Sequence, residues 1–460
     1  MEIKKLKLYQ IVEATCSDIV SEGLGISHIK SAEYKPLTGF VLGVMPGETF
    51  LAKITRVKSG HFLAVVLPVT EIPDQWIGMQ NKQSQICHDT WALFNISPRR
   101  LKPECKIFTL CGSCKMLHMS YENSLEFKTK WIYTQLERNR VNHPEIKVIP
   151  SPRITKYRNH VQIHVNKHAQ RGFYAPYSYT TKAFPQEGCL LFDQALVDQN
   201  FPEELRLEKC IRARIDYIQN KTGIWSLYSP DDKKGNFTYK IDYPKNSTTD
   251  VCIPNSTFFQ TNTSIIPLWL EEIETMLGFS NPEFSNLRIL ELFSGFGFIS
   301  RMLSYKHNLS VLGVDILSQN DLAKIAITND RFTASIAEQD FRKNYIQLDL
   351  TILEKIKPET KEKIRSFQPE IIIMNPPRSG FLTQQFHYFL QNVLENMHTK
   401  SIVYSSCNGA TFARDSACLA DNGYALHKLT LLDFFPWTSH YEVVGLFFKK
   451  VSVTQPTSLL

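Results

Sequence analysis

The chain has 460 residues, of which 43% are hydrophobic and 21% charged, values that are ordinary for a globular protein of two or three domains. No apolar stretch approaches the 18 residues that a membrane helix needs, and the lysine-rich N-terminus lacks the apolar segment of a secretory signal. We therefore expect a cytoplasmic protein without membrane contact, whose net charge of +7 is compatible with a polyanionic partner.

Residues 1–72 are predicted to form a small β-barrel. Short apolar strands alternate with glycine-containing turns, at Gln10–Ala14, Gly39–Met45, Phe50–Thr55 and His61–Val66. Two strings, Glu22-Gly23-Leu24-Gly25-Ile26 and Phe40-Val41-x-Gly-x-x-Pro-Gly-Glu48, resemble the TRAM domain, an OB-like barrel that binds RNA.

Residues 73–255 read as an irregular α+β region that contains a helix over about Leu117–Arg140. Its strongest signal is Cys105-x5-Cys111-x2-Cys114, with Cys189 downstream as a fourth thiol. In a cytoplasmic protein such thiols are free or bind metal, and four thiolates suit either a [4Fe–4S] cluster or tetrahedral zinc. Spacing alone leaves both open, but the five-residue first gap disfavours a radical-SAM cluster.

Basic and aromatic residues interleave between Arg153 and Tyr179. Single-stranded RNA is bound by this mixture, because rings stack on bases and cations pair with phosphates. A solvated basic strand pair would have a similar composition, and we favour RNA.

Residues 256–450 alternate strand and helix, which predicts an α/β domain, followed by a tail over 451–460. The expected strands are Leu287–Phe293, Leu309–Asp315, Glu370–Met374 and Ser401–Ser405. The sheet should be mostly parallel, with ligands at the carboxyl ends of its strands.

The turn after the first of these strands predicts a cofactor site. Glu291-Leu-Phe293-Ser-Gly295-Phe-Gly297 has two glycines but lacks the third of the dinucleotide fingerprint, and Asp315 ends the next strand. This pattern fits S-adenosylmethionine better than NAD, with Asp315 on the ribose. Further candidates for the cofactor are Gln260, Asn262, and Asp349, which could instead cap a helix.

Two later motifs predict the chemistry. Cys407 follows an apolar strand, and Glu442 lies downstream in Phe435-Pro-Trp-Thr-Ser-His-Tyr-Glu442, which suggests a covalent nucleophile and a base. Asn375-Pro-Pro-Arg378 forms a stiff turn after another strand, and it can present Asn375 to a flat base.

In this order, the motifs resemble the RNA uracil-C5 methyltransferase family, from the TRAM-like barrel to about Lys450. The resemblance implies a Rossmann-like class I S-adenosylmethionine-dependent domain. It implies that Cys105, Cys111, Cys114 and Cys189 hold a [4Fe–4S] cluster with a structural role. It also assigns the cofactor site to Gln260, Glu291, Gly295, Asp315 and Asn375, the nucleophile to Cys407 and the base to Glu442. We add Phe293, Gly297 and Asp349 as further candidate cofactor residues.

Such an enzyme adds its thiolate to C6 of uracil, which activates C5 for methylation, and its base then removes the C5 proton. The target uridine must leave its stack. The expected protein is a monomer that acts on RNA, with large-subunit ribosomal RNA favoured and transfer RNA as the alternative.

The chain departs from the family pattern at three positions. Asn375 replaces the usual Asp, Gly409 replaces a proline and predicts a more mobile loop, and Ser124 replaces a glutamine while Lys128 is kept. We expect these changes to affect substrate affinity more than reaction type. Two rival interpretations are an amino methyltransferase, for which Asn-Pro-Pro is typical, and a non-catalytic RNA-binding protein.

Overall fold

The computed structural model describes residues 4–34, 36–73, 91–166, 168, 170–197, 210–216, 224–228, 236–254, 257–279, 287–331, 341–395, 397 and 399–450. The expected tail, 451–460, lies outside these ranges. Within them, none of the helices combines the length and apolarity needed to cross a bilayer.

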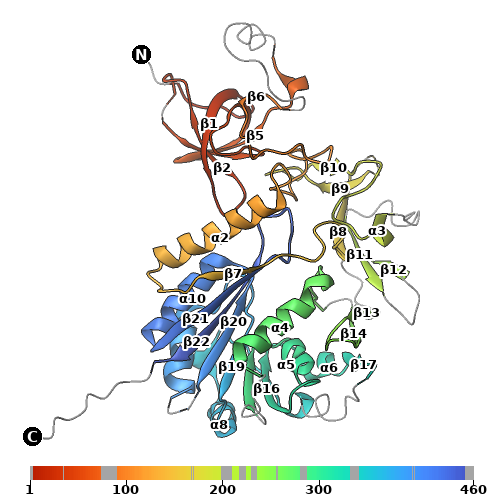
Figure 1. Cartoon of the computed structure of the whole chain (residues 1–460), viewed down its shortest axis with the longest axis vertical. Coiled ribbons are helices and arrows are strands. Elements are labelled where there is room, and N and C mark those ends of the chain that lie inside the picture. Colours follow the sequence, from red (N-terminus) through yellow and green to blue (C-terminus); the bar gives the residue numbers. More distant parts are fainter. Residues whose placement is uncertain are drawn as a thin grey trace, which may run out of the picture.

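The expected N-terminal β-barrel is present (Figure 1). Its strands are β1 (Ile11–Ile19), β2 (Gly25–Ile29), β3 (Thr38–Leu42), β4 (Thr49–Val57) and β5 (His61–Val66). Their order is β1-β2-β3-β5-β4, and β4 pairs back onto β1, which closes the barrel. Buried residues alternate with partly buried ones, as in β5, where Phe62, Ala64 and Val66 are buried. The short strand β6 (Leu93–Asn95) extends the sheet beyond β4.

A buried ion pair fastens the barrel to the chain that follows it. The Arg100 guanidinium donates to both oxygens of Glu48, at 2.6 Å each, and also to the carbonyl of Gly43. The Glu48 carboxylate accepts two further bonds, from the backbone N–H groups of Met45 and Ser97. Both charged side chains are almost fully buried, so each depends on the other for compensation.

The central region contains a five-stranded antiparallel sheet. In sheet order its strands are β10 (Thr181–Ala183), β9 (Arg171–Tyr174), β8 (His160–Val165), β11 (Cys210–Asp216) and β12 (Ile224–Tyr228), and the short helix α3 (Gln194–Val197) adjoins it. Val161 and Ile163 of β8 are buried, whereas Gln162 between them is exposed. This alternation gives the sheet one apolar face.

The C-terminal half forms an eight-stranded sheet. In sheet order the strands are β18 (Tyr345–Gln347), β16 (Leu309–Asp315), β15 (Leu287–Leu292), β19 (Ile371–Met374), β20 (Ser401–Ser406), β22 (Glu442–Lys449), β21 (Tyr424–Leu432) and β7 (Ile146–Ile149). The first five are mutually parallel, as expected, and β22 and β21 run as an antiparallel hairpin.

Helices cover both faces of this sheet (Figure 1). They are α4 (Ile266–Leu277), α5 (Phe298–Leu303), α6 (Gln319–Leu322), α8 (Pro358–Phe367), α9 (Thr383–Tyr388) and α10 (Gly409–Asp421). Alternate residues of β15 therefore enter two different cores: Leu290 and Leu292 join one, and Leu287 and Ile289 join the other.

Two elements cross the expected boundary at residue 255. Helix α2 (Tyr121–Arg138), capped by Ser120, buries Trp131 and Ile132 in the same core as α10, and β7 pairs with β21 at the sheet edge. On its other side, α2 contacts the barrel, because the Trp131 indole donates to the Ile19 carbonyl at 2.8 Å. Figure 1 shows this helix lying between the barrel and the large sheet.

A small sheet also joins segments far apart in sequence. Strands β13 (Asn236–Ile241) and β14 (Thr249–Pro254) form a hairpin, and β17 (Ala326–Asn329) from the C-terminal half pairs with β14. The central and C-terminal halves are thus linked by backbone pairing as well as by shared cores.

We predict that Glu48→Gln lowers the free energy of unfolding by about 3–5 kcal/mol, because it leaves the Arg100 charge buried without a counter-charge. Urea denaturation measures this loss. The matched control is Glu33→Gln at the exposed Lys4–Glu33 pair, where a change of at most about 1 kcal/mol is expected. Equal effects at the two sites would contradict the importance of the buried pair.

Candidate active site

Strands β20 and β22 set Cys407 beside Glu442. The last pair of their antiparallel register is Ser406 with Val443, and one further step of the same register brings Cys407 opposite Glu442. Both residues line one large cavity, although the sequence separates them by helix α10 and strand β21. The structure thus brings together the two residues that the sequence suggested as nucleophile and base.

The surroundings of Cys407 act on its thiol in opposite directions. Burial, and then the carboxylate of Glu442, raises the pKa of the thiol. The guanidinium of Arg378 lowers that pKa. Cys407 also directly precedes the N-terminus of α10, whose dipole favours an anion. Arg378 and the helix therefore favour the thiolate, which is the nucleophilic form.

Glu442 is buried at the start of β22. Burial raises the pKa of its carboxyl group to about 7, and a hydrogen bond from Ser405 opposes this rise. The Ser405 hydroxyl donates to Oε1 of Glu442 at 2.6 Å. A carboxyl group with a pKa near neutrality can take up and release a proton under working conditions, as a catalytic base must.

The loop that joins β21 to Glu442 is held from several directions. Four successive carbonyls of this loop accept hydrogen bonds from separate parts of the chain: Phe434 from the Asn262 amide, Phe435 from the Lys128 ammonium, Pro436 from the Tyr157 hydroxyl, and Trp437 from the backbone N–H groups of Lys115 and Met116. Trp437 has a φ of +64°, which is uncommon for a non-glycine residue.

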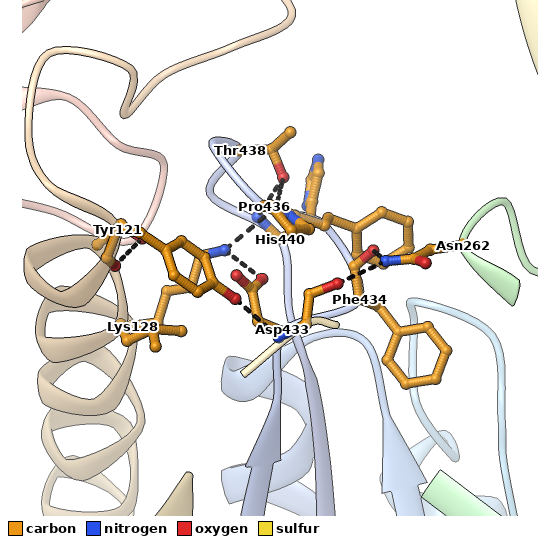
Figure 2. A network of polar contacts seen from close by, with 12 residues as sticks. Tyr121, Lys128, Asn262, Asp433, Phe434, Pro436, Thr438 and His440 are labelled. Atoms are coloured by element: carbon orange, nitrogen blue, oxygen red, sulfur yellow. Dashed lines mark hydrogen bonds and ion pairs between the residues drawn. The ribbon is translucent and has the colours of Figure 1, made fainter. Parts of the chain in front are cut away.

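At the start of the loop, Lys128 of α2 forms an ion pair of 2.6 Å with Asp433, and both side chains are fully buried (Figure 2). Burial lowers the pKa of Lys128, while the charge of Asp433 and its hydrogen bond raise it. Lys128 is thus an anchor of the loop rather than a surface cation. Ser124 is buried on the same helix and donates to the Tyr121 carbonyl.

Asn262 has a different position from the one that the sequence suggested. Its side chain is fully buried, and Figure 2 shows its amide nitrogen bound to the Ser151 hydroxyl and to the Phe434 carbonyl. Its side-chain oxygen accepts a bond from Ser264. Asn262 is not among the residues that line the cavity, so it links segments instead of contacting a cofactor.

The cavity has a volume of about 720 Å³, which accommodates a nucleoside-sized cofactor together with a base. Seven predicted site residues line it: Gln260, Glu291, Phe293, Gly295, Asn375, Cys407 and Glu442. Burial raises the pKa of Glu291 to about 7. The cavity opens at the carboxyl ends of β15, β19 and β20, as expected for an α/β sheet.

Several features of the cavity wall fit S-adenosylmethionine. Gly295 has a φ of +54°, and the space beside its Cα is open, so a ligand can approach its backbone closely. The hydroxyls of Thr261 and Ser294 are buried at the wall and have no hydrogen-bond partner among the described residues. Such polar atoms need a partner, which a polar ligand would supply.

Besides Asn262, three predicted cofactor residues do not line the cavity. Asp315 accepts bonds from the backbone N–H groups of Gly295 and Leu317, so it shapes the turn that does line it. Gly297 precedes α5, as expected, and a Cβ there would lie 2.2 Å from the Phe341 ring, so this glycine serves close packing. Asp349 caps its own turn by accepting from the N–H and hydroxyl of Thr351.

Sequence reasoning missed Trp269 of α4, which lines the cavity, and Ser405, which binds Glu442. A signal for Ser405 was present, because it lies two residues before Cys407 and therefore on the same side of β20. Nothing in the sequence marked Trp269, whose position depends on how α4 packs against the sheet.

Gly409 also differs from expectation. It is the buried first residue of α10, where Asn408 caps the helix by accepting from the Ala410 N–H. A Cβ at position 409 would lie within 2.5 Å of the Tyr441 hydroxyl and of a methyl group of Ile132. Close packing next to Cys407, rather than a mobile loop, accounts for the glycine.

The four predicted cluster ligands, Cys105, Cys111, Cys114 and Cys189, line one small cavity whose other walls are mostly apolar. Burial raises the pKa values of Cys105, Cys114 and Cys189, the last to about 11. The buried guanidinium of Arg158 lowers the pKa values of Cys114 and Cys189. Across the described residues, no group of three or more His, Cys, Asp or Glu side chains is arranged to hold a single metal ion.

The chain is similar to known RNA methyltransferases. Residues 252–451 match the model of the tRNA (uracil-5-)-methyltransferase family. An uncharacterized RNA methyltransferase of Leptospira interrogans is 30% identical over 88% of each chain. The 23S rRNA (uracil(1939)-C(5))-methyltransferase of Haemophilus parainfluenzae is 24% identical over 97% of this chain and 98% of its own length.

A solved structure has the same fold. The tRNA (uracil-54, C5)-methyltransferase of Pyrococcus abyssi, in complex with S-adenosyl-L-homocysteine, superimposes with a TM-score of 0.62 at 18% identity, over 95% of this chain and 99% of that one. The matched family segment contains every residue that lines the large cavity. Because this segment matches the family model, and because the Leptospira relative is similar over most of both chains, the chain belongs to the RNA uracil-C5 methyltransferase family.

Proposed function

We propose that this enzyme methylates C5 of a uridine in 23S ribosomal RNA through a covalent bond between Cys407 and C6 of the base. The observation that carries the proposal is the shared cavity, in which the Cys407 thiol and the Glu442 carboxyl group meet the residues expected at a cofactor. An amino methyltransferase would need neither a thiol nor this carboxyl group. The full-length similarity to a 23S rRNA methyltransferase supports ribosomal RNA as the substrate.

Transfer RNA is the second candidate substrate. The matching family model and the Pyrococcus structure both carry tRNA in their names. This support for transfer RNA is weaker than the support for ribosomal RNA. The family model matches residues 252–451 alone, and the Pyrococcus chain is 18% identical.

In the proposed reaction, the Cys407 thiolate forms a bond to C6 of uracil, and the electron pair of the C5=C6 bond moves toward C5 and the O4 carbonyl. Bound S-adenosylmethionine supplies the methyl group that C5 takes. The Glu442 carboxylate then removes the proton from C5, the electrons of that C–H bond restore C5=C6, and the C6–S bond breaks. Arg378 stabilises the thiolate before the addition and after its release.

Gln260, Glu291, Phe293 and Gly295 would hold the cofactor at its end of the cavity, with Asp315 fixing the Gly295 turn. Asn375 would contact the uracil ring. Its amide oxygen accepts from the N3–H group without the charge that an aspartate would bring, so the bond is about half as strong.

The central sheet carries an aromatic surface that supports contact with single-stranded RNA. The rings of His164 and Tyr174 stack at 3.8 Å, and Tyr179, which is 89% exposed, meets Tyr174 edge-on. Lys115 lies 5.9 Å from the centre of the Tyr177 ring. Exposed rings beside cations are suited to bases and phosphates respectively.

We further propose that Cys105, Cys111, Cys114 and Cys189 bind a [4Fe–4S] cluster with a structural role. A four-iron cluster separates its thiolates more widely than one zinc ion does, so the absence of a single-ion geometry in the described residues is compatible with it. The buried Arg158 cation fits an anionic centre at this place.

The proposed division of the chain is a TRAM-like barrel over 1–72, a central domain over 73–255 and a methyltransferase domain over 256–450. Because α2 and β7 pack with the methyltransferase sheet, the segment 121–149 is assigned physically to that domain. The enzyme is proposed to act as a cytoplasmic monomer.

We predict that a strain lacking this chain loses one 5-methyluridine from 23S rRNA. Nuclease digestion followed by mass mapping of total RNA measures the change, and re-expression of the chain should restore it. A loss from tRNA instead would support the second candidate, and loss of a methylated amino group would support an amino methyltransferase.

The two catalytic assignments predict opposite effects on the covalent intermediate. Cys407→Ala should bind RNA but form no adduct with 5-fluorouridine RNA. Glu442→Gln should accumulate a methylated adduct with ordinary RNA, because the thiolate cannot leave until the C5 proton is removed. Denaturing gels and mass spectrometry detect both outcomes. Methylation by Cys407→Ala, or normal turnover by Glu442→Gln, would refute the corresponding role.

For the cluster, we predict that protein purified without oxygen is brown and contains about four iron and four sulfide ions per chain. Cys189→Ser should lose the colour and the iron, whereas Cys252→Ser, which changes a cysteine outside this cavity, should keep both. Iron, sulfide and zinc analysis decides the matter, and stoichiometric zinc without sulfide would overturn the assignment.

A further inference from the structure

Ser405 stands between the cavity and the core of the methyltransferase domain. Its hydroxyl donates to Oε1 of Glu442 at 2.6 Å, and it accepts a bond of 3.2 Å from the indole N–H of Trp269. All three side chains are at least 98% buried, and Trp269 and Glu442 line the cavity. A chain of two hydrogen bonds therefore runs from helix α4, through strand β20, to strand β22.

The strand register explains why Ser405 reaches Glu442. Ser405 pairs with Val444, so Glu442, two residues before Val444, and Cys407, two residues after Ser405, share one side of the sheet. Among the described residues, Ser405 is the one that donates a hydrogen bond to the Glu442 side chain. This bond fixes Oε1 of Glu442. No hydrogen bond from the described residues restrains Oε2 of Glu442, which is therefore available to the cavity.

We infer that Ser405 is a positioning residue for the step that removes the C5 proton: with its own hydroxyl oriented by Trp269, it binds one carboxylate oxygen of Glu442 and leaves the other for the substrate. This inference rests on the proposed role of Glu442 as the base. Ser405 itself does not contact the reacting atoms.

The charges around Glu442 decide how this bond affects the base. Directly after β20 the Cys407 thiol faces it, and the turn after β19 contributes Arg378. The adjoining loop contributes His440, whose pKa is lowered to about 4 by burial and nearby cations. Helix α4 contributes the uncharged Trp269. His440 is therefore neutral near pH 7, and the Ser405 bond is the specific stabiliser of the carboxylate.

Loss of the Ser405 hydroxyl should raise the pKa of Glu442 above about 7, because a donor to the charged form is removed. The base works as the carboxylate, so proton removal should then need a higher pH. A hydrogen bond to a charged group corresponds to a shift of about one pH unit or more.

Two assays on the intact enzyme separate this effect from general damage. Tritium release from RNA that contains [5-³H]uridine reports proton removal from C5. Covalent trapping by 5-fluorouridine RNA reports the earlier thiolate addition, because fluorine at C5 cannot be removed as a proton. Both are measured between pH 5.5 and 9 in single turnover with saturating cofactor.

For Ser405→Ala, we expect the lower limb of the plot of tritium-release rate against pH to move up by about one pH unit. The rate should then be about tenfold below that of the wild type at pH 6, and the difference should become smaller as the pH rises. Trapping should stay within about twofold of the wild type. Trp269→Phe keeps a ring but removes the N–H, and should move the limb in the same direction by less. The matched control is Ser416→Ala, which removes a buried serine hydroxyl bound to the Phe412 carbonyl in α10 and should change neither assay.

An unchanged limb in Ser405→Ala would overturn the inference, and so would equal losses in both assays, which indicate damage to the strand. Glu442→Gln distinguishes the inference from the proposed function. If Glu442→Gln releases tritium normally, the proposed base is wrong. If it stalls while Ser405→Ala keeps the wild-type profile, the role of Ser405 alone is wrong.

Discussion

The active site depends on the buried ion pair between Lys128 and Asp433. Neither side chain has contact with solvent, so each charge needs the other, and the pair ties helix α2 to the end of strand β21. The next residues of the chain form the loop to Glu442, and successive carbonyls of that loop are bound from outside it. Glu442 therefore starts β22 in a position that distant segments determine. A loop without these bonds would leave Glu442, the proposed base, free to move relative to Cys407, which directly follows a strand paired on both sides in the sheet.

The same loop connects the cysteine cavity to the chemistry. Lys115 and Met116, which directly follow Cys114, donate their backbone N–H groups to the Trp437 carbonyl. Tyr157, beside Arg158 and the cysteines, binds the neighbouring carbonyl of Pro436. A centre that orders the segment from Cys105 to Cys114 would thus also order the loop that leads to Glu442. Through this coupling, a cluster would affect the geometry of the site. It would therefore have a function even though the proposed reaction requires no electron transfer.

Short sequence patterns predicted the strands and strand ends whose structure depends on neighbouring residues. The strand expected at Leu309–Asp315 has those bounds, and the strand expected at Ser401–Ser405 ends one residue later, at Ser406. These central strands are buried on both faces, so their apolar runs are continuous. Cys407 and Glu442 could be named because their motifs stand at strand ends that an antiparallel register brings together. Strand β7 could not be predicted from the sequence, because it has four residues, two of them partly buried, and is recognisable only through its pairing with β21.

The site residues that sequence missed or misassigned share one property: their partners are distant in the chain. Asn262 lies in a motif next to Gln260, and sequence proximity suggested the same ligand for both, but its amide binds Phe434 instead. The role of Ser405 depends on a strand 37 residues away and on a helix from another part of the domain. A single sequence does not reveal such long-range contacts. Glycine positions and strand ends, in contrast, can be predicted because they depend on residues close to them in the chain.

The neutral Asn375 is consistent with the electrostatics of the cavity. Glu291 and Glu442 already line it, and burial raises the pKa of each to about 7. A third carboxylate in the same low-dielectric space would favour protonation of its neighbours, because like charges disfavour one another's ionised forms. Glu442, the proposed base, would then be less often ionised near neutral pH. Asparagine avoids this effect, and under the proposed function it would still accept a hydrogen bond from uracil N3–H, although a weaker one. The substitution would therefore exchange strength of uracil recognition for ionisation of the proposed proton acceptor.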